Sequence, residues 1–245
     1  MNLFKKTLVM TFSALVAGSA IGESAFTEAQ RTEIESIAAS YLAEHPEVVV
    51  QALQKLQADQ EKEQLKKIAE VGEYFRSAAG TPASGDADAE HYLIDIYDYN
   101  CGYCKDMEPF IKKLAADKSF SLRVVHVNVP VISEASAMSA TIAQALFNLY
   151  PEKFSAFHDK IMIDRINPND LDELKKAAED AGCDWKAILK ELESRRPQQK
   201  VSADLRRVRE LGLNGTPYLI IDGRGYPGAV RSFEELKQRF EKPLD

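Results

Sequence analysis

The chain has 245 residues, of which 45% are hydrophobic and 28% charged, and its formal net charge is −7. This length and composition suit a globular protein with a sizeable core, and three cysteines are too few for a disulfide-stapled scaffold. The excess of acidic over basic side chains argues against nucleic acid or an anionic membrane as a partner.

The first twenty residues have the parts of a secretory signal peptide. A basic start at Lys5 and Lys6 precedes an apolar stretch from Leu8 to Val16, which small residues follow. A permanent membrane anchor is the alternative, but it needs about 20 apolar residues, and Glu23 interrupts the stretch too soon. We therefore expect residues 1–20 to be cleaved and the mature protein to be exported.

Residues 26–77 follow a helical pattern throughout. Thr27 and Gln30 form a capping box, and Pro46 divides the segment into two helices. Apolar residues recur at helical spacing, but the polar run 57–64 separates them, so the regular heptads of a coiled coil are absent. The apolar face needs a cover, either the same chain or a second copy, and we favour self-association because the next segment reads as a detaching linker. The apolar positions are Ile34, Ile37, Tyr41, Leu42, Val49, Leu53, Leu56, Leu65, Ile68 and Phe75.

Residues 78–90 are small and polar without periodicity, which predicts a flexible linker. The catalytic domain is predicted to span 91–245, with a helical insertion at about 133–211 that lacks strand patterns. The expected strands are His91–Tyr99, Phe120–Val129, Tyr218–Ile221 and Tyr226–Val230, and helices are expected over Cys101–Ala116 and near the C-terminus. This order of elements predicts an α/β fold.

Cys101 and Cys104 stand where the first strand gives way to a helix. A helix N-terminus favours a thiolate, and a second thiol nearby completes a dithiol able to exchange disulfides. A zinc site is disfavoured because it needs four ligands, and the other cysteine and the histidines are scattered along the chain. Covalent haem attachment is disfavoured because it needs a histidine directly after Cys104, where Lys105 stands. A purely structural disulfide would close too small a loop to stabilise much. The motif therefore indicates redox chemistry.

A second element lies over a hundred residues further on. Pro217 begins the strand Tyr218–Ile221 after the Gly215 turn, where a cis bond to Thr216 can be held. The Thr216 backbone could then pair with a bound peptide as an added strand. An ordinary trans proline at a strand start is the alternative.

These motifs carry a resemblance. Tyr97 to Lys105, followed by Asn214 to Pro217, resembles the DsbA-like branch of the thioredoxin superfamily, and the segment from Phe26 to Val48 is similar to the start of the ScsC (suppressor of copper sensitivity protein C) group. The resemblance implies a thioredoxin fold with a helical insertion, preceded by an extended helical N-terminal segment that oligomerises in some relatives. It also implies a periplasmic thiol–disulfide oxidoreductase or isomerase with a link to copper tolerance.

The roles of five residues follow. Cys101 is the predicted nucleophile, Cys104 the resolving thiol, and Thr216 and Pro217 are expected to flank the sulfurs and hold substrate. Asp95 stands where the superfamily often has a buried acid, which could relay a proton to Cys104. A solvent-facing Asp95 is the alternative. The pair Gly102-Tyr103 resembles that of the isomerase DsbC, which favours isomerase or reductase chemistry.

No cofactor is expected beyond the redox disulfide. The expected partners are unfolded or misoxidised exported proteins, a membrane redox partner and further copies of the chain through residues 26–77. A copper(I)-binding protein that uses Cys101 and Cys104 as soft ligands is the competing hypothesis. A third hypothesis, a structural protein that uses the N-terminal helices as a scaffold, is weaker because it gives Cys101 and Cys104 no role. Cys183 is expected to be a buried apolar residue, with a regulatory disulfide as the alternative.

Overall fold

The computed structural model describes residues 26–213 and 215–241. The predicted signal peptide at 1–20 lies outside the described residues. Among the helices that the structure describes, none combines the length and the apolar character needed to cross a bilayer. The chain divides after Gln57 into two compact units.

The first unit is built from helices α1 (Glu28–Glu44) and the first part of α2 (Pro46–Ser77). The capping box is confirmed: the Gln30 N–H donates to Thr27 Oγ1 over 3.3 Å, and the Thr27 N–H donates to Gln30 Oε1 over 2.9 Å. No residue of α1 is buried, although the helix carries a full apolar repeat. The large apolar side chains exposed in this unit include Ile34, Ile37, Tyr41, Leu42, Val48, Val49, Val50, Leu53 and Leu56.

The last turns of α2 belong to the second unit and pack on its sheet. Ile68, Val71 and Phe75 are at most 5% exposed and share a core with strand residues. A Cβ atom on Gly72 would lie 3.2 Å from Ile220 Cγ2, so glycine permits the close approach of helix and sheet here. The prediction that a second copy covers the apolar face of 26–77 is therefore wrong for these turns, which the same chain covers.

The predicted linker at 78–90 is also corrected. Residues Ala83–Gly85 form strand β1, which pairs antiparallel with β3 (Leu122–Asn128) at the edge of the sheet. Thr81 is buried and accepts a hydrogen bond from Lys200 Nζ over 2.8 Å. Sequence patterning missed this strand because its residues are small, and a three-residue edge strand needs no alternating apolar pattern.

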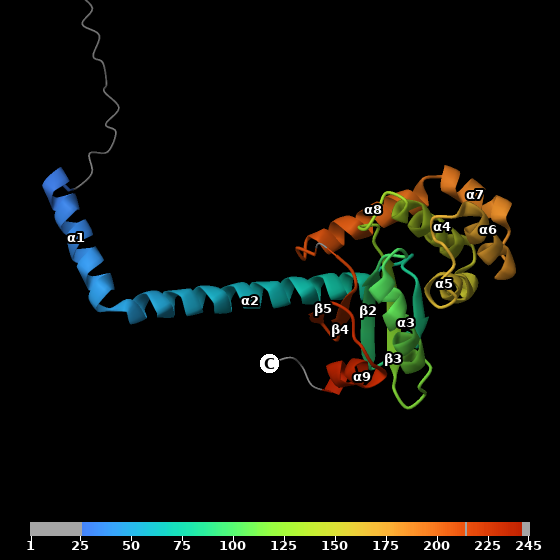
Figure 1. Cartoon of the computed structure of the whole chain (residues 1–245), viewed down its shortest axis with the longest axis horizontal. Coiled ribbons are helices and arrows are strands. Elements are labelled where there is room, and N and C mark those ends of the chain that lie inside the picture. Colours follow the sequence, from blue (N-terminus) through green and yellow to red (C-terminus); the bar gives the residue numbers. More distant parts are fainter. Residues whose placement is uncertain (1–25, 214, 242–245) are drawn as a thin grey trace, which may run out of the picture. The chain divides into compact units, whose positions relative to one another are not determined.

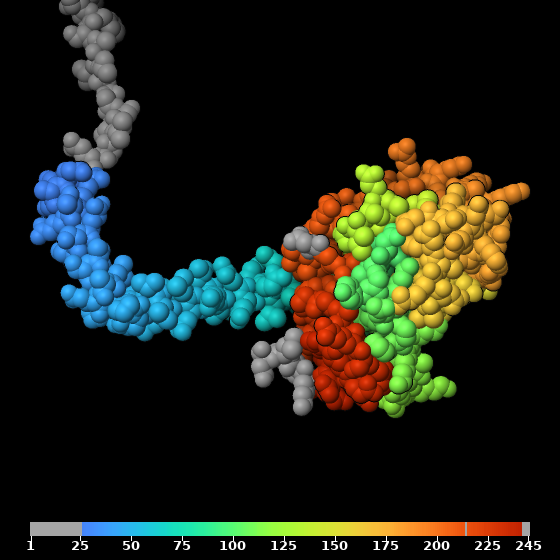
Figure 2. Space-filling model, in the orientation of Figure 1, coloured from blue at the N-terminus to red at the C-terminus, as the bar shows by residue number. Residues whose placement is uncertain are grey.

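The expected α/β thioredoxin fold with a helical insertion is confirmed, and its centre is a sheet of order β1-β3-β2-β4-β5. Strands β2 (His91–Tyr97) and β3 are parallel, while β4 (Tyr218–Ile221) runs antiparallel to β2, and β5 (Arg224–Pro227) runs antiparallel to β4 (Figure 1). Helices α3 (Gly102–Ala115) and α9 (Phe233–Glu241) cover one face through Met107, Ile111 and Leu236. Their surfaces adjoin in the space-filling view (Figure 2). The last turns of α2 and α8 (Arg196–Arg209) cover the other face.

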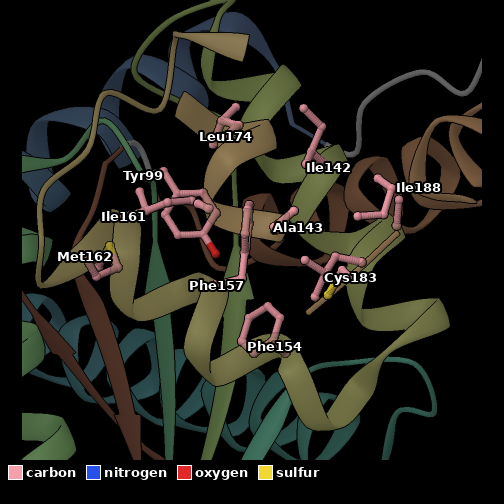
Figure 3. Packing of buried hydrophobic residues seen from close by; sticks show 14 of the residues in the cluster. Tyr99, Ile142, Ala143, Phe154, Phe157, Ile161, Met162, Leu174, Cys183 and Ile188 are labelled. Atoms are coloured by element: carbon pink, nitrogen blue, oxygen red, sulfur yellow. The ribbon is translucent and has the colours of Figure 1, made fainter. Parts of the chain in front are cut away.

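The insertion between β3 and β4 has a core of its own. The insertion consists of α4 (Ser136–Leu149), the short 3₁₀ helix η1 (Pro151–Lys153), α5 (Phe154–Met162), α6 (Leu171–Asp180), α7 (Trp185–Glu193) and α8. Figure 3 shows Tyr99 among the apolar side chains of this core, together with Phe157 and Leu174. Cys183 lies in the same cluster and is 6% exposed. The segment that leads to Cys101 is therefore packed against the insertion.

Candidate active site

The two sulfurs of the C-x-x-C motif meet at the N-terminus of α3. Cys101 is the N-cap residue, and its Sγ accepts the Cys104 N–H over 3.2 Å. The Thr216 carbonyl oxygen lies 3.5 Å from the same sulfur, which is hydrogen-bond distance for the thiol form. Cys101 is 3% exposed and Cys104 1%. A substrate disulfide must therefore lie directly against this turn to reach Cys101.

The surroundings of the two sulfurs shift the pKa values of Cys101 and Cys104 in opposite directions. Hydrogen bonding from the Cys104 thiol lowers the pKa of Cys101 to about 6, against the opposing effect of burial and with help from Thr216 and the Cys104 N–H. Burial raises the pKa of Cys104 far above its usual value, and the hydrogen bond to Cys101 and the charge of Asp95 act in the same direction. At neutral pH the arrangement has one thiolate and one thiol, as a nucleophile and a resolving partner require.

The sheet brings the distant Thr216–Pro217 pair to these sulfurs, because β4 pairs with β2 directly below the motif. The Thr216–Pro217 peptide bond is cis, as expected. Pro217 is buried, and its carbonyl oxygen accepts the Gly228 N–H over 3.0 Å, which ties the turn to the end of β5.

Asp95 lies inside the protein, with 1% exposure, so the solvent-facing alternative is wrong. Neither carboxyl oxygen has a hydrogen-bond partner within the described part of the chain. Burial, followed by the negative charges of Glu108 and Cys101, raises the pKa of Asp95 well above its usual value. A buried carboxyl group with a raised pKa is suited to exchange protons with Cys104, and that role stays a prediction.

Sequence reasoning missed a buried polar group behind the cysteines. Glu108 Oε1 lies 3.3 Å from His158 Nε2, and both side chains are at most 4% exposed. The hydroxyl groups of Tyr97 and Tyr99 lie 3.4 and 3.2 Å from His158 Nδ1. Burial would raise the pKa of Glu108, but His158 holds it below its usual value through charge and a hydrogen bond. The signal was available in part, since Glu108 stands four residues after Cys104 and so shares its helix face.

A groove opens beside the cysteine turn. Its volume is about 600 Å³, and it is lined by Tyr103, Asp106, Phe110, Thr216, Pro217, Gly228, Ala229, Val230 and Arg231. Tyr103 is 70% exposed at its rim, whereas the nearby Tyr97 and Tyr99 are core residues. The groove places an apolar surface and the Thr216 backbone next to the nucleophile, where an extended polypeptide could bind.

Metal ligands beyond the two sulfurs are absent from the described residues: no group of three or more histidine, cysteine, aspartate or glutamate side chains is arranged to hold an ion. The copper(I) hypothesis therefore depends on Cys101 and Cys104 alone, and it stays a prediction.

Known proteins share this architecture. A DSBA-like thioredoxin domain matches residues 128–241, and the copper resistance protein ScsC N-terminal domain matches residues 30–63. Disulfide bond formation protein D of Bacillus subtilis is 23% identical over 179 residues, which is 69% of this chain and 79% of that protein. A linker-deletion variant of Proteus mirabilis ScsC superposes with a TM-score of 0.63 at 23% identity, covering 90% of this chain and 97% of that one. A periplasmic thioredoxin-like protein from Salmonella enterica gives a TM-score of 0.60 at 26% identity, covering 70% and 94%.

The fold and the family matches are those of DsbA-like thiol–disulfide oxidoreductases, and residues 128–241 carry the DSBA-like thioredoxin domain. The match of residues 30–63 to the ScsC N-terminal domain supports the ScsC group. The resemblance drawn from the sequence is thereby confirmed.

Proposed function

We propose that the protein is a periplasmic disulfide isomerase, which exchanges disulfides with exported proteins through Cys101 and Cys104 and acts as an oligomer. The observation that carries the exchange chemistry is the Cys101 sulfur, which caps α3 and accepts the Cys104 N–H over 3.2 Å. The periplasmic location is supported by the Salmonella relative, which is described as periplasmic.

The first chemical step uses the lowered pKa of Cys101. Its thiolate attacks one sulfur of a substrate disulfide, so a mixed disulfide forms and the other substrate sulfur leaves as a thiolate. The groove beside Thr216 and Pro217 supports this step by holding the substrate segment next to the attacking sulfur. No electrons are gained or lost overall in the exchange.

The mixed disulfide has two fates. In reduction, Cys104 loses its proton and attacks Cys101, which frees the second substrate thiolate and leaves the Cys101–Cys104 disulfide. In isomerisation, another substrate thiolate attacks instead, which forms a new substrate disulfide and regenerates the Cys101 thiolate. The raised pKa of Cys104 supports isomerisation, because a protonated resolving thiol leaves time for the substrate to rearrange.

Assembly is supported by the exposed apolar face of residues 34–56. A series of large apolar side chains there, including Ile37 at 63% and Leu53 at 54% exposure, is more than a single chain leaves in water without a partner. Several copies joined through this face would present several active sites to one misfolded substrate, which favours retention until the correct thiol attacks.

The test separates assembly from chemistry. Replacing Val49, Leu53 and Leu56 together by serine is expected to give monomers by light scattering that still reduce insulin but no longer reactivate scrambled ribonuclease. The matched control is Leu171→Ser, an exposed leucine in the insertion at 48% exposure, which should change neither property. A monomeric triple variant that isomerises as well as the original protein would exclude the proposal.

A further inference from the structure

The carboxylate of Asp98, three residues before Cys101, is completely buried and has an unusual set of partners. Its Oδ2 accepts the N–H groups of Val131 and Ile132 over 2.9 and 3.0 Å, and its Oδ1 accepts the Asn100 N–H over 2.8 Å. The Asp98 carbonyl oxygen accepts the N–H of Cys101 over 2.8 Å. One residue thus joins the turn that carries the nucleophile to the loop between β3 and α4.

A second set of contacts holds the same turn. The Asn100 side chain donates to Asn169 Oδ1 over 3.0 Å and accepts from Asn169 Nδ2 over 2.8 Å. It also donates to Ser136 Oγ over 2.9 Å at the start of α4. The position of Cys101 is therefore tied to three separate parts of the β3–β4 crossover.

The carboxylate carries a charge that these contacts do not need. Uncharged acceptors such as carbonyl oxygens satisfy backbone N–H groups in most buried turns. A charge of the same sign as the thiolate, kept three residues away inside the protein, disfavours the ionised form of Cys101. In agreement, Asp98 opposes the lowering of the Cys101 pKa. The charge acts on Lys105 in the opposite sense and favours its ammonium form.

We propose that Asp98 is a positioning residue with two effects: its hydrogen bonds fix Cys101 at the head of α3, and its charge limits how far the thiolate is stabilised. A more stable thiolate favours the reduced dithiol and makes the disulfide a stronger oxidant. The charge of Asp98 therefore makes the Cys101–Cys104 disulfide a weaker oxidant than it would be without that charge. The inference rests on exchange at Cys101, and it holds whether or not the protein isomerises or assembles.

The test is the substitution Asp98→Asn in the full-length protein. The amide oxygen can still accept the Val131 and Ile132 N–H groups, the acceptor of the Asn100 N–H is lost, and the charge is removed. We expect the Cys101 pKa, measured by thiolate absorbance, to fall by at least about half a unit, a threefold change in the ratio of thiolate to thiol. The equilibrium with glutathione should move by a similar factor toward the reduced dithiol.

Two further variants separate charge from folding. Asp98→Glu retains the charge and should keep the pKa of Cys101 near that of the original protein, even if its melting temperature falls. Asp117→Asn removes a half-buried carboxylate just beyond the far end of α3 and should change neither the pKa of Cys101 nor the glutathione equilibrium. Asp98→Ser, which is also uncharged, replaces the asparagine variant if that one does not fold.

Three results would overturn the inference. The first is a lower melting temperature in Asp98→Asn with an unchanged pKa and equilibrium, which would make the residue purely structural. The second is a Glu variant whose pKa falls as far as that of the Asn variant. The third is an equal shift in Asp117→Asn. Insulin reduction by the original protein tests the exchange chemistry separately, so a failure of that chemistry can be told apart from a failure of this inference.

Discussion

Two regions depart in opposite directions from the usual pattern of buried apolar and exposed charged side chains. One is the turn before Cys101, and the other is the pair of N-terminal helices. Near the cysteines, Asp95, Asp98 and Glu108 are at most 3% exposed. In the N-terminal helices, Ile37 and Leu53 are more than half exposed. Charged residues are rarely buried without cause, and a large exposed apolar face marks a site of association. The comparison teaches that buried charge points to the site of chemistry, and that apolar surface left in water predicts a site of association.

The largest effect is expected from removing the nucleophile, which tests whether the buried turn alone is responsible for disulfide exchange. Cys101→Ser should lower the rate of insulin reduction by at least about a thousandfold, because a serine hydroxyl does not ionise near neutral pH. Its oligomeric state should be unchanged. Cys183→Ala is the matched control and should keep the full rate. More than about 1% residual activity in the serine variant would contradict the assignment of the nucleophile.

The next prediction compares the two parts of α2. Phe75, which is 1% exposed, packs against the sheet, and Phe75→Ala should lower the free energy of unfolding by about 3–5 kcal/mol. Leu53→Ala, on the exposed face, should change it by less than about 0.5 kcal/mol in dilute monomer. Urea denaturation at low protein concentration measures both. Equal losses would show that both parts of the helix are covered by the same chain.

The pH dependence tests the electrostatics of the buried turn. The alkylation rate of Cys101 should be half-maximal near pH 6 and fall about tenfold for each unit below it, because only the thiolate reacts. Since this pKa lies below the ordinary value of 9.0, it stabilises the folded reduced protein above pH 9, and the effect is lost as the pH falls from about 9 to 6. Iodoacetamide trapping across pH 4–9 measures the profile. A midpoint above pH 8 would contradict it.

The smallest effect concerns Asp95. Asp95→Asn fills the same space without a group that can act as acid or base, so attack by Cys104 on the mixed disulfide should slow by at least about tenfold. The alkylation rate of Cys101 at its optimum should change much less. Because burial raises the pKa of Asp95, the native protein loses stability as the pH rises above the ordinary carboxyl range, and the asparagine variant should be more stable at pH 7. Stopped-flow decay of a trapped mixed disulfide measures the first effect. Unchanged decay would remove Asp95 from the mechanism.

Much of the domain was predictable because its signals are local. The helical spacing of Met107 and Ile111 and the apolar runs of the strands define their elements from neighbouring residues alone. Strand β1 was missed because a short edge strand is defined by its partner, and Ala83–Gly85 carries no pattern of its own. The apolar spacing along α2 does not show which turns the same chain covers, because only the sheet decides that Phe75 is covered and Leu53 is not.

The sequence by itself determined the redox pair, its place at the start of a helix and the second motif at Pro217, because each depends on residue type and spacing along the chain. Only the tertiary structure decided that Thr216 lies against Cys101, that Asp95 and Glu108 are buried together, and that Asp98 holds the turn through Val131 and Ile132. These contacts join residues far apart in the chain. Burial and charge interactions depend on distances in space, which the order of residues does not contain.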